Sequence, residues 1–543
     1  MQANNNKPNN RLTSSASAKI NNRNVNMANS MVLIMVATLI SKLLGFLREM
    51  VTSNKLGASR TADIYIYCTM ITVTLFSTIF EAIRTTYIPN YSSAKTKNGT
   101  KSSLQFSNNI INIVTIITII ISLAGFLISP FIISVFSRFR GADYNLAVYM
   151  LKILFTSAIF QATTNVFVGY LQANGQFFIP GIISLPYNIC IILPLLFYDK
   201  VGVDGLLIGS VLALAVQPLF LLPFALKKGY RYSLRIYTKD EHTKNAIFSS
   251  FPIMLGGAVQ QINAFVDKSL ASSLVEGSIA ALNYSNKLML FVFSMFSISV
   301  STIIFPNLSA YNAKDQITEY KNMLSKSISF LNIVLIPSTA ALIILSRPII
   351  MLLFEHGKFD ATATTLTSGT LIFYSLGILF YGYRDVLNKA FYSVHDTKTP
   401  MINAVLSLAL TITLNFILIK PMQANGLALA SSVSAVFTTI LLFFSLRKKI
   451  GAFGLKGIFI SLLKSAAATA IFSAVLYFGY DILNKNFPKA HVFYMQFLIL
   501  AIIGIVGIVL YFFTLKLLKS AELEWGINMF KSMLAKRKNK NNA

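Results

Sequence analysis

Cysteine, histidine, tryptophan and acidic side chains are all scarce in this chain of 543 residues. It has two cysteines, four histidines and one tryptophan. The cysteines, Cys68 and Cys190, both lie in apolar segments without histidines at ligand spacing, which excludes a disulfide framework and a metal centre built from cysteine and histidine. We assign both cysteines to packing.

Charged residues are also few. They make up 12% of the chain against 55% hydrophobic residues, and the mean hydropathy is +0.63. A soluble globular surface cannot hide that much apolar area. We therefore predict an all-α polytopic membrane protein.

The charges that are present are mostly basic, with 47 Lys and Arg against 19 Asp and Glu. No basic stripe is interleaved with stacking aromatics, so nucleic acid is not an expected partner. Windows of about 20 apolar residues predict about fourteen transmembrane helices. The basic residues are concentrated in alternate connections and in both tails, which predicts that both termini are cytoplasmic.

The chain also repeats itself at an offset of about 220 residues, which indicates an internal duplication. The sequence TTYIPNYS at 85–92 resembles TIIFPNLS at 302–309, and Asp204-Gly205-Leu206 resembles Asn425-Gly426-Leu427. Each half holds an even number of helices, so the halves share one orientation. This predicts two pseudo-symmetric six-helix lobes around a central cavity. The expected divisions are a disordered cytoplasmic tail at 1–28, an N-lobe at 29–228, a C-lobe at 245–449, two more helices at 456–518 and a basic cytoplasmic tail at 519–543.

Cations inside the apolar segments are the strongest functional signal. Lys42 and Arg48 lie in the first apolar run, and Lys287 lies in the eighth. A charge at bilayer depth costs a few kcal/mol, so it is retained where it faces a polar cavity. Six residues on one helix separate Lys42 and Arg48 by about 120°, so they can line adjoining walls. Alternatively, Lys42 snorkels to the interface and Arg48 forms an interfacial pair with Glu49.

Several segments resemble one known family. They are SKLLGFLRE at 41–49, LGA at 56–58, Ala62-Asp63, YSNKLM at 284–289, FEHGKF at 354–359 and FYSVHDTKTP at 391–400. Together they resemble the MurJ/MviN family of lipid II flippases, in the multidrug/oligosaccharidyl-lipid/polysaccharide exporter superfamily. The resemblance covers roughly residues 29–520.

The resemblance implies a transporter and not an enzyme. It implies a bacterial cytoplasmic-membrane protein of fourteen helices that moves lipid II, an undecaprenyl-diphosphate-linked disaccharide-peptide, from the inner to the outer leaflet by alternating access. It also implies a central cationic cavity and a lipid-tail groove formed by the last two helices. The family's essential cations fall on Lys42, Arg48 and Lys287, which we expect to bind the diphosphate.

The acidic residues have less defined roles. Glu49, Asp63 and Asp267 could pair with the cations in the empty state or gate one end of the cavity. Secondary candidates, interpreted chiefly as local helix pairs, are Glu81, Arg84, Arg384, Asp385 and Lys389.

Departures from the family pattern also permit transport of a related lipid-linked glycan. Lys42 and Lys287 stand where many members carry Arg, and Lys cannot form the bidentate fork to phosphate. A flippase for another undecaprenyl-linked surface polysaccharide is therefore the main alternative. A cation-coupled drug exporter fits a basic cavity poorly, and a non-transporting scaffold that recruits cell-wall synthesis enzymes would leave the buried cations without a purpose.

No cofactor is expected. The chain has no phosphate-binding loop of the Gly-x-x-x-x-Gly-Lys-Ser/Thr type, so ATP is not expected to drive the cycle directly. The membrane potential is the first hypothesis for the energy source, and a coupling ion is the second. The expected partners are lipid II or a related lipid-linked glycan, membrane lipids and, through the basic C-terminal tail, enzymes of cell-wall synthesis.

Overall fold

The computed structural model describes residues 39–237, 240–487, 493–520 and 522–524. The expected N-terminal tail at 1–28, and most of the expected C-terminal tail at 519–543, lie outside the described residues. Within the described residues all the regular secondary structure is helical. The predicted all-α polytopic membrane protein is confirmed.

The helices of the first half form one group, which we call the N-terminal group. Its members are residues 39–56, α2 (Arg60–Thr69), the π-helix η1 (Met70–Thr74), α3 (Leu75–Phe136), α4 (Ala142–Phe155), α5 (Ala158–Ala173), α6 (Phe178–Gly181), α7 (Ser184–Leu196) and α8 (Tyr198–Lys227).

The helices that follow form the C-terminal group and a final pair. The C-terminal group contains α9 (Glu241–Ala271), α10 (Ser278–Ala313), α11 (Ile317–Ile344), α12 (Ser346–Phe354), α13 (Ala361–Ser375), α14 (Ile378–Ser393) and α15 (Lys398–Ile450). The final pair is α16 (Leu455–Asn486) and α17 (Phe493–Leu517).

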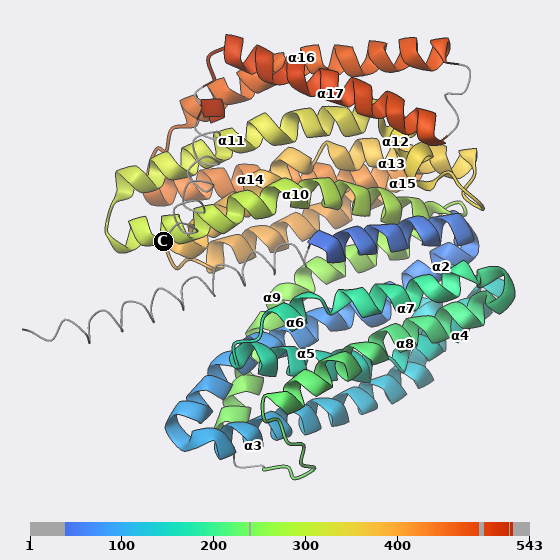
Figure 1. Cartoon of the computed structure of the whole chain (residues 1–543), viewed down its shortest axis with the longest axis vertical. Helices are drawn as coiled ribbons and strands as arrows, with labels where there is room; N and C mark the ends of the chain where they lie inside the picture. Colours follow the sequence, from blue (N-terminus) through green and yellow to red (C-terminus); the bar gives the residue numbers. More distant parts are fainter. Residues whose placement is uncertain (1–38, 238–239, 488–492, 521, 525–543) are drawn as a thin grey trace, which may run out of the picture.

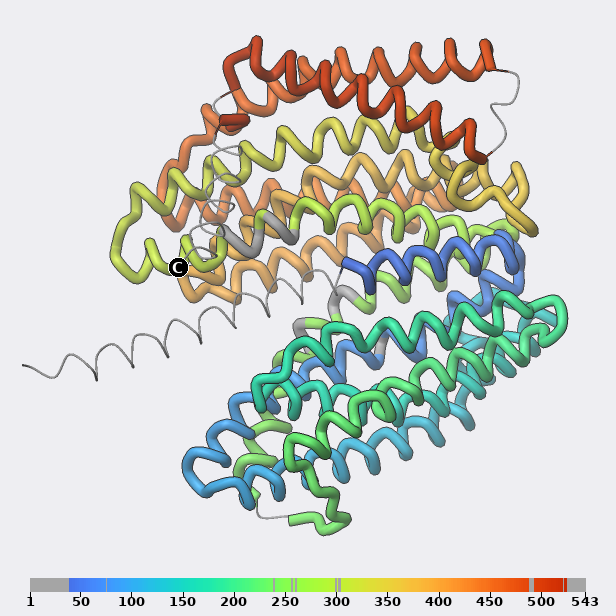
Figure 2. The backbone as a smooth tube through the Cα atoms, viewed as in Figure 1, coloured from blue at the N-terminus to red at the C-terminus, as the bar shows by residue number. Residues whose placement is uncertain are grey.

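Three of these helices contain a break at which the chain bends or reverses direction. α3 has 62 residues, which at 1.5 Å per residue is about three times the thickness of the hydrocarbon core. Gly99 interrupts it with a φ of 80°, and Figure 2 shows the chain turning back between its two halves. Gln423 interrupts α15 with a φ of 50°, and Gly202 interrupts α8 with a φ of 60°.

Some of these breaks recur at the offset seen in the sequence. Gly202 and Gln423 stand at equivalent positions of the two repeats, and both have a positive φ. Gly175 and His395 form a second equivalent pair, and both have a positive φ at the turn before a new helix. Equivalent positions of the two halves therefore adopt the same unusual backbone conformation, although only one member of each pair is a glycine.

Nine helices in the described part of the chain are long and apolar enough to cross a membrane, or ten if the bent pair α13 and α14 forms one span. This number is below fourteen partly because the segment Arg60–Phe136 and the 53-residue α15 each count once. In addition, the first apolar run begins at residues that the structure does not describe.

Figure 1 shows the N-terminal and C-terminal groups meeting at the right of the view and diverging toward the left. The N-terminal group has its own aromatic core, in which Tyr87, Tyr170 and Tyr230 are buried.

α9 packs against both α3 and α15 and so links the two groups. The pair α16 and α17 packs on α11, where the Tyr511 hydroxyl donates to the Ile333 carbonyl at 2.7 Å.

Candidate functional site

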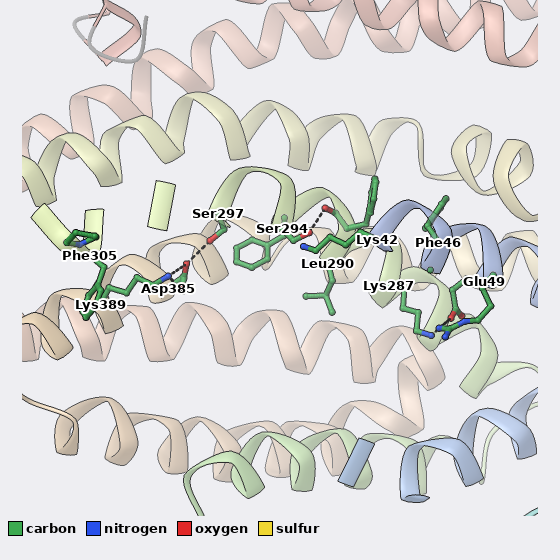
Figure 3. A pocket seen from close by; sticks show the side chains of 15 residues that line it. Lys42, Phe46, Glu49, Lys287, Leu290, Ser294, Ser297, Phe305, Asp385 and Lys389 are labelled. Carbon is green, nitrogen blue, oxygen red and sulfur yellow. Dashed lines mark hydrogen bonds and ion pairs between the residues drawn. The ribbon is translucent and has the colours of Figure 1, made fainter. Parts of the chain in front are cut away.

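A cavity of about 890 Å³ lies between the two groups. Its walls come from the helix at 39–56, from α10 and from α14. Its charged lining residues are Lys42, Arg48, Glu49, Lys287, Asp385 and Lys389. Figure 3 shows Glu49 and Lys287 at one end of the cavity and Asp385 and Lys389 at the other.

Glu49 joins two cations from different groups. Its Oε1 accepts from Arg48 Nη2 at 2.6 Å and also from the Lys287 ammonium. The Asn283 amide approaches the other carboxylate oxygen at 3.4 Å, and the Arg48 guanidinium lies over the Tyr187 ring, 5.5 Å from its centroid. The Glu49 side chain is only 8% exposed, so this cluster is a buried link between the first helix and α10.

The carboxylates do not balance the cations of the cavity. Arg48 and Lys287 share one carboxylate, while Lys389 is paired with Asp385 at 3.0 Å. No ion pair within the described ranges includes Lys42. Four cations and two carboxylates among the described lining residues leave a net charge of two positive. A low-dielectric cavity with this charge attracts anions.

One cation beside the cluster was missed by the sequence reasoning. Lys268 of α9 lines a small recess of about 120 Å³ together with Arg48, Glu49, Tyr187 and Lys287. The signal was available, because Lys268 directly follows Asp267 in an apolar stretch, and the criterion that selected Lys42 applies to it equally.

Asp63 lies elsewhere, at a contact between the groups that we call the seam, formed by residues 54–63, 276–280 and 357–358. It is 1% exposed, and its carboxylate accepts from the backbone amides of Gly277 and Ala280, each at 2.8 Å. It thus caps the first turn of α10, where a negative charge is favoured. Lys358 N also donates to the Asn54 carbonyl at 2.8 Å.

The other acidic and secondary candidates are dispersed. Asp267 accepts from the Asn415 amide, which joins α9 to α15, and does not line the cavity. Glu81 and Arg84 form an exposed pair at 2.6 Å on α3. Arg384 of α14 lies over the Tyr381 ring and lines a separate recess. The structure therefore brings Lys42, Arg48, Lys287, Glu49, Asp385 and Lys389 into one cavity and leaves Asp63, Asp267, Glu81, Arg84 and Arg384 outside its lining.

Comparisons with known proteins agree on one family. The family model described as "Lipid II flippase MurJ" matches residues 52–499. A probable lipid II flippase MurJ of Treponema pallidum is 27% identical over 435 residues, covering 77% of this chain and 81% of the relative. That of Vibrio cholerae is 29% identical over 433 residues, covering 76% and 81%.

Solved structures give a similar result. A lipid II flippase MurJ in an inward closed conformation matches with a TM-score of 0.75 and 26% identity, covering 89% of this chain and 98% of that one. A multidrug resistance MATE family transporter in an inward-facing conformation matches with a TM-score of 0.68 and 11% identity, covering 78% and 98%. The second match shows that the likeness of fold extends to a MATE transporter of the multidrug/oligosaccharidyl-lipid/polysaccharide exporter superfamily.

Proposed function

Because this chain belongs to the MurJ family of lipid II flippases, we propose that it moves lipid II from the inner to the outer leaflet of the bacterial cytoplasmic membrane. It is a transporter and not an enzyme. The observation that carries the proposal is the cavity in which Arg48 and Lys287 share Glu49 while Lys42 stands without an ion pair among the described residues.

The cavity chemistry suits a diphosphate. A diphosphate with a large polar headgroup cannot enter hydrocarbon, so its carrier must supply charge-assisted hydrogen bonds in a polar cavity. Lys42, Arg48 and Lys287 are the proposed diphosphate ligands. The incoming diphosphate competes with Glu49 for Arg48 and Lys287, which loosens the link between the two groups when the substrate binds.

We propose that the helices form about fourteen spans, most of them in two related lobes. Dividing α3 at Gly99 and α15 at Gln423 raises the ten spans to twelve, and adding the first helix at 39–56 and α9 gives about fourteen. We assign them to an N-lobe at 29–228, a C-lobe at 245–449 and the final pair of helices. The recurrence of backbone breaks at equivalent positions of the repeat supports two related halves. Rocking of the lobes about the seam would then alternate the side to which the cavity opens.

The orientation in the membrane follows from the basic residues. The bias of basic residues assigns both termini to the cytoplasm, so the seam lies toward the outer face and Asp63 is a proposed outer gate. The exposed apolar side chains of α16 and α17, including Phe459 and Phe513, favour a surface along which the polyprenyl tail slides.

Complementation tests the proposal. The chain is expressed in cells depleted of their own lipid II flippase, and lipid II in the outer leaflet is measured for the wild type, for Arg48→Ala and for Arg347→Ala, an exposed arginine of α12. We expect rescue by the wild type and Arg347→Ala, and loss of rescue with Arg48→Ala. Membrane-inserted wild type that fails to rescue would contradict the proposal and favour another undecaprenyl-linked glycan, a cargo that lysines at positions 42 and 287 also permit.

A further inference from the structure

A second recess of about 400 Å³ adjoins the cationic cavity. We call it the alcove; its walls come from α9, α10, α14 and α15. It shares Leu290, Phe293 and Asp385 with the cavity. The two spaces are therefore neighbours that share part of their lining.

Two consecutive residues of α10 line the two spaces, one residue for each space. Lys287 lines the cavity, and Asn286 lines the alcove. Successive residues of a helix point about 100° apart, so a ligand whose anion is held at Lys287 can continue past α10 to Asn286. This geometry places the alcove where the headgroup beyond a bound diphosphate would lie.

The alcove is rich in amides and hydroxyls. Asn263, Asn286 and Asn388 line it, as do Ser434 and Thr438. Ser434 is only 2% exposed, and its hydroxyl has no hydrogen-bond partner among the described residues. The Asn263 carbonyl oxygen is likewise unpartnered within that part of the chain. Buried polar groups cost about 1–3 kcal/mol each when unpaired, so the polar lining of the alcove favours a polar ligand over an apolar one.

Among the described residues that line the alcove, Arg384 is the one cation and Asp385 is the one carboxylate. Its guanidinium lies over the Tyr381 ring, 5.2 Å from the centroid. The ion pairs of the described residues do not include Arg384, and the neighbouring Asp385 is paired with Lys389. A guanidinium fixed against an aromatic ring offers a planar fork that matches a carboxylate.

We propose that the alcove binds the peptide part of the lipid-linked headgroup, with Arg384 pairing with a free peptide carboxylate and the asparagines meeting peptide amides. A peptide supplies both the amides and the anion that this lining matches, whereas a neutral sugar supplies no anion for Arg384. This inference rests on the proposed function and adds the residues that select the headgroup.

Binding by the purified full chain in lipid nanodiscs tests the inference. Three probes are compared: lipid II with free peptide carboxylates, the same lipid with those carboxylates converted to amides, and undecaprenyl diphosphate without a headgroup. We expect the wild type to prefer the free carboxylates about tenfold, as for one charge-assisted pair. Arg384→Gln should lose this preference while binding undecaprenyl diphosphate like the wild type, and Arg384→Lys should keep part of it.

Arg347→Gln is the matched control, because this exposed arginine lies on α12 outside the alcove lining, and it should keep the full preference. Equal binding of the free and amidated lipids by the wild type would overturn the inference, as would an unchanged preference in Arg384→Gln. Failure of the wild type to bind any of the three lipids would instead count against the proposed function.

Discussion

At the scale of single residues, the decisive feature is that one carboxylate, Glu49, serves two cations from opposite groups. Arg48 and Lys287 both donate to it, so it screens the repulsion between them. In the proposed cycle a diphosphate displaces Glu49 from at least one cation, which would weaken substrate binding but couple it to the separation of the two groups.

Glu49→Gln should therefore change substrate binding and transport in opposite directions. Without the competing carboxylate, undecaprenyl diphosphate should bind several-fold more tightly, because both cations are free to pair with phosphate. Lipid II transport should fall at least tenfold, because the cations are no longer held together in the empty state. Binding to purified protein and lipid II flipping in liposomes check these two effects.

Asp481→Asn is the control for this prediction. Asp481 forms an exposed pair with Lys485 on α16, and exposed pairs contribute about 0–1 kcal/mol, so both binding and flipping should stay at the wild-type level. Unchanged binding and transport in Glu49→Gln would show that the shared carboxylate has no part in the cycle.

The sequence alone was enough to predict the main cations of the cavity. Lys42, Arg48 and Lys287 stand out as cations in apolar runs, and all three line the cavity. The partners of Asp63 could not be selected in this way, because they are backbone amides at the start of α10, in the other half of the chain. Backbone amides occur at every non-proline position, so no side-chain pattern marks the two that Asp63 binds.

At the scale of elements, the first turn of α10 depends on a carboxylate from α2. Asp63→Asn removes the charge that favours a helix N-terminus, so the seam should open more often. We expect backbone amides 277–281 to exchange hydrogen about tenfold faster, as measured by mass spectrometry. This corresponds to about 1.4 kcal/mol, within the range for a helix cap.

A second cap gives the matched control. Asp360 caps α13 by accepting from Ala363 N at 2.8 Å, so Asp360→Asn should loosen the start of α13 and leave 277–281 unchanged. If Asp63→Asn left the exchange of 277–281 at the wild-type rate, its bonds to α10 would not hold the seam.

The end of the first helix makes a second, steric prediction. Gly57 has a φ of 66°, and a Cβ there would lie 2.4 Å from the Lys358 carbonyl oxygen. Gly57→Ala should therefore destabilise the protein by about 1–3 kcal/mol, through backbone strain and the clash with this carbonyl, and lower its melting temperature. Gly457→Ala on α16 meets no atom within 4 Å and should leave the melting temperature unchanged or higher; equal melting temperatures for the two variants would contradict the close contact.

Hydropathy predicts where the chain can cross a membrane but not where a helix stops. Residues Leu75–Phe136 hold two apolar runs, yet the helical backbone is interrupted only at Gly99. Gln423 shows the limit most clearly, because its φ of 50° has no glycine to announce it. The internal repeat indicates a break at this position, since the equivalent residue of the first half is Gly202, which also has a positive φ.

At the scale of the whole molecule, the cavity carries a net charge of two positive among its described lining residues. Charges that move through the membrane field exchange about 2.3 kcal/mol per charge per 100 mV. Collapsing the potential across proteoliposomes with an ionophore should therefore slow lipid II flipping severalfold. A flipping rate that is unchanged after collapse would exclude the potential as the energy source and leave a coupling ion.

Lys42, Arg48 and Lys287 together are the proposed carriers of lipid II across the membrane. The most direct measurement is the rate at which lipid II becomes accessible in the opposite leaflet of liposomes that contain either the wild type or the Lys42→Ala, Arg48→Ala, Lys287→Ala triple variant. This role predicts flipping by the wild type and a rate at the level of protein-free liposomes for the folded triple variant. Equal flipping by the two proteins would contradict it.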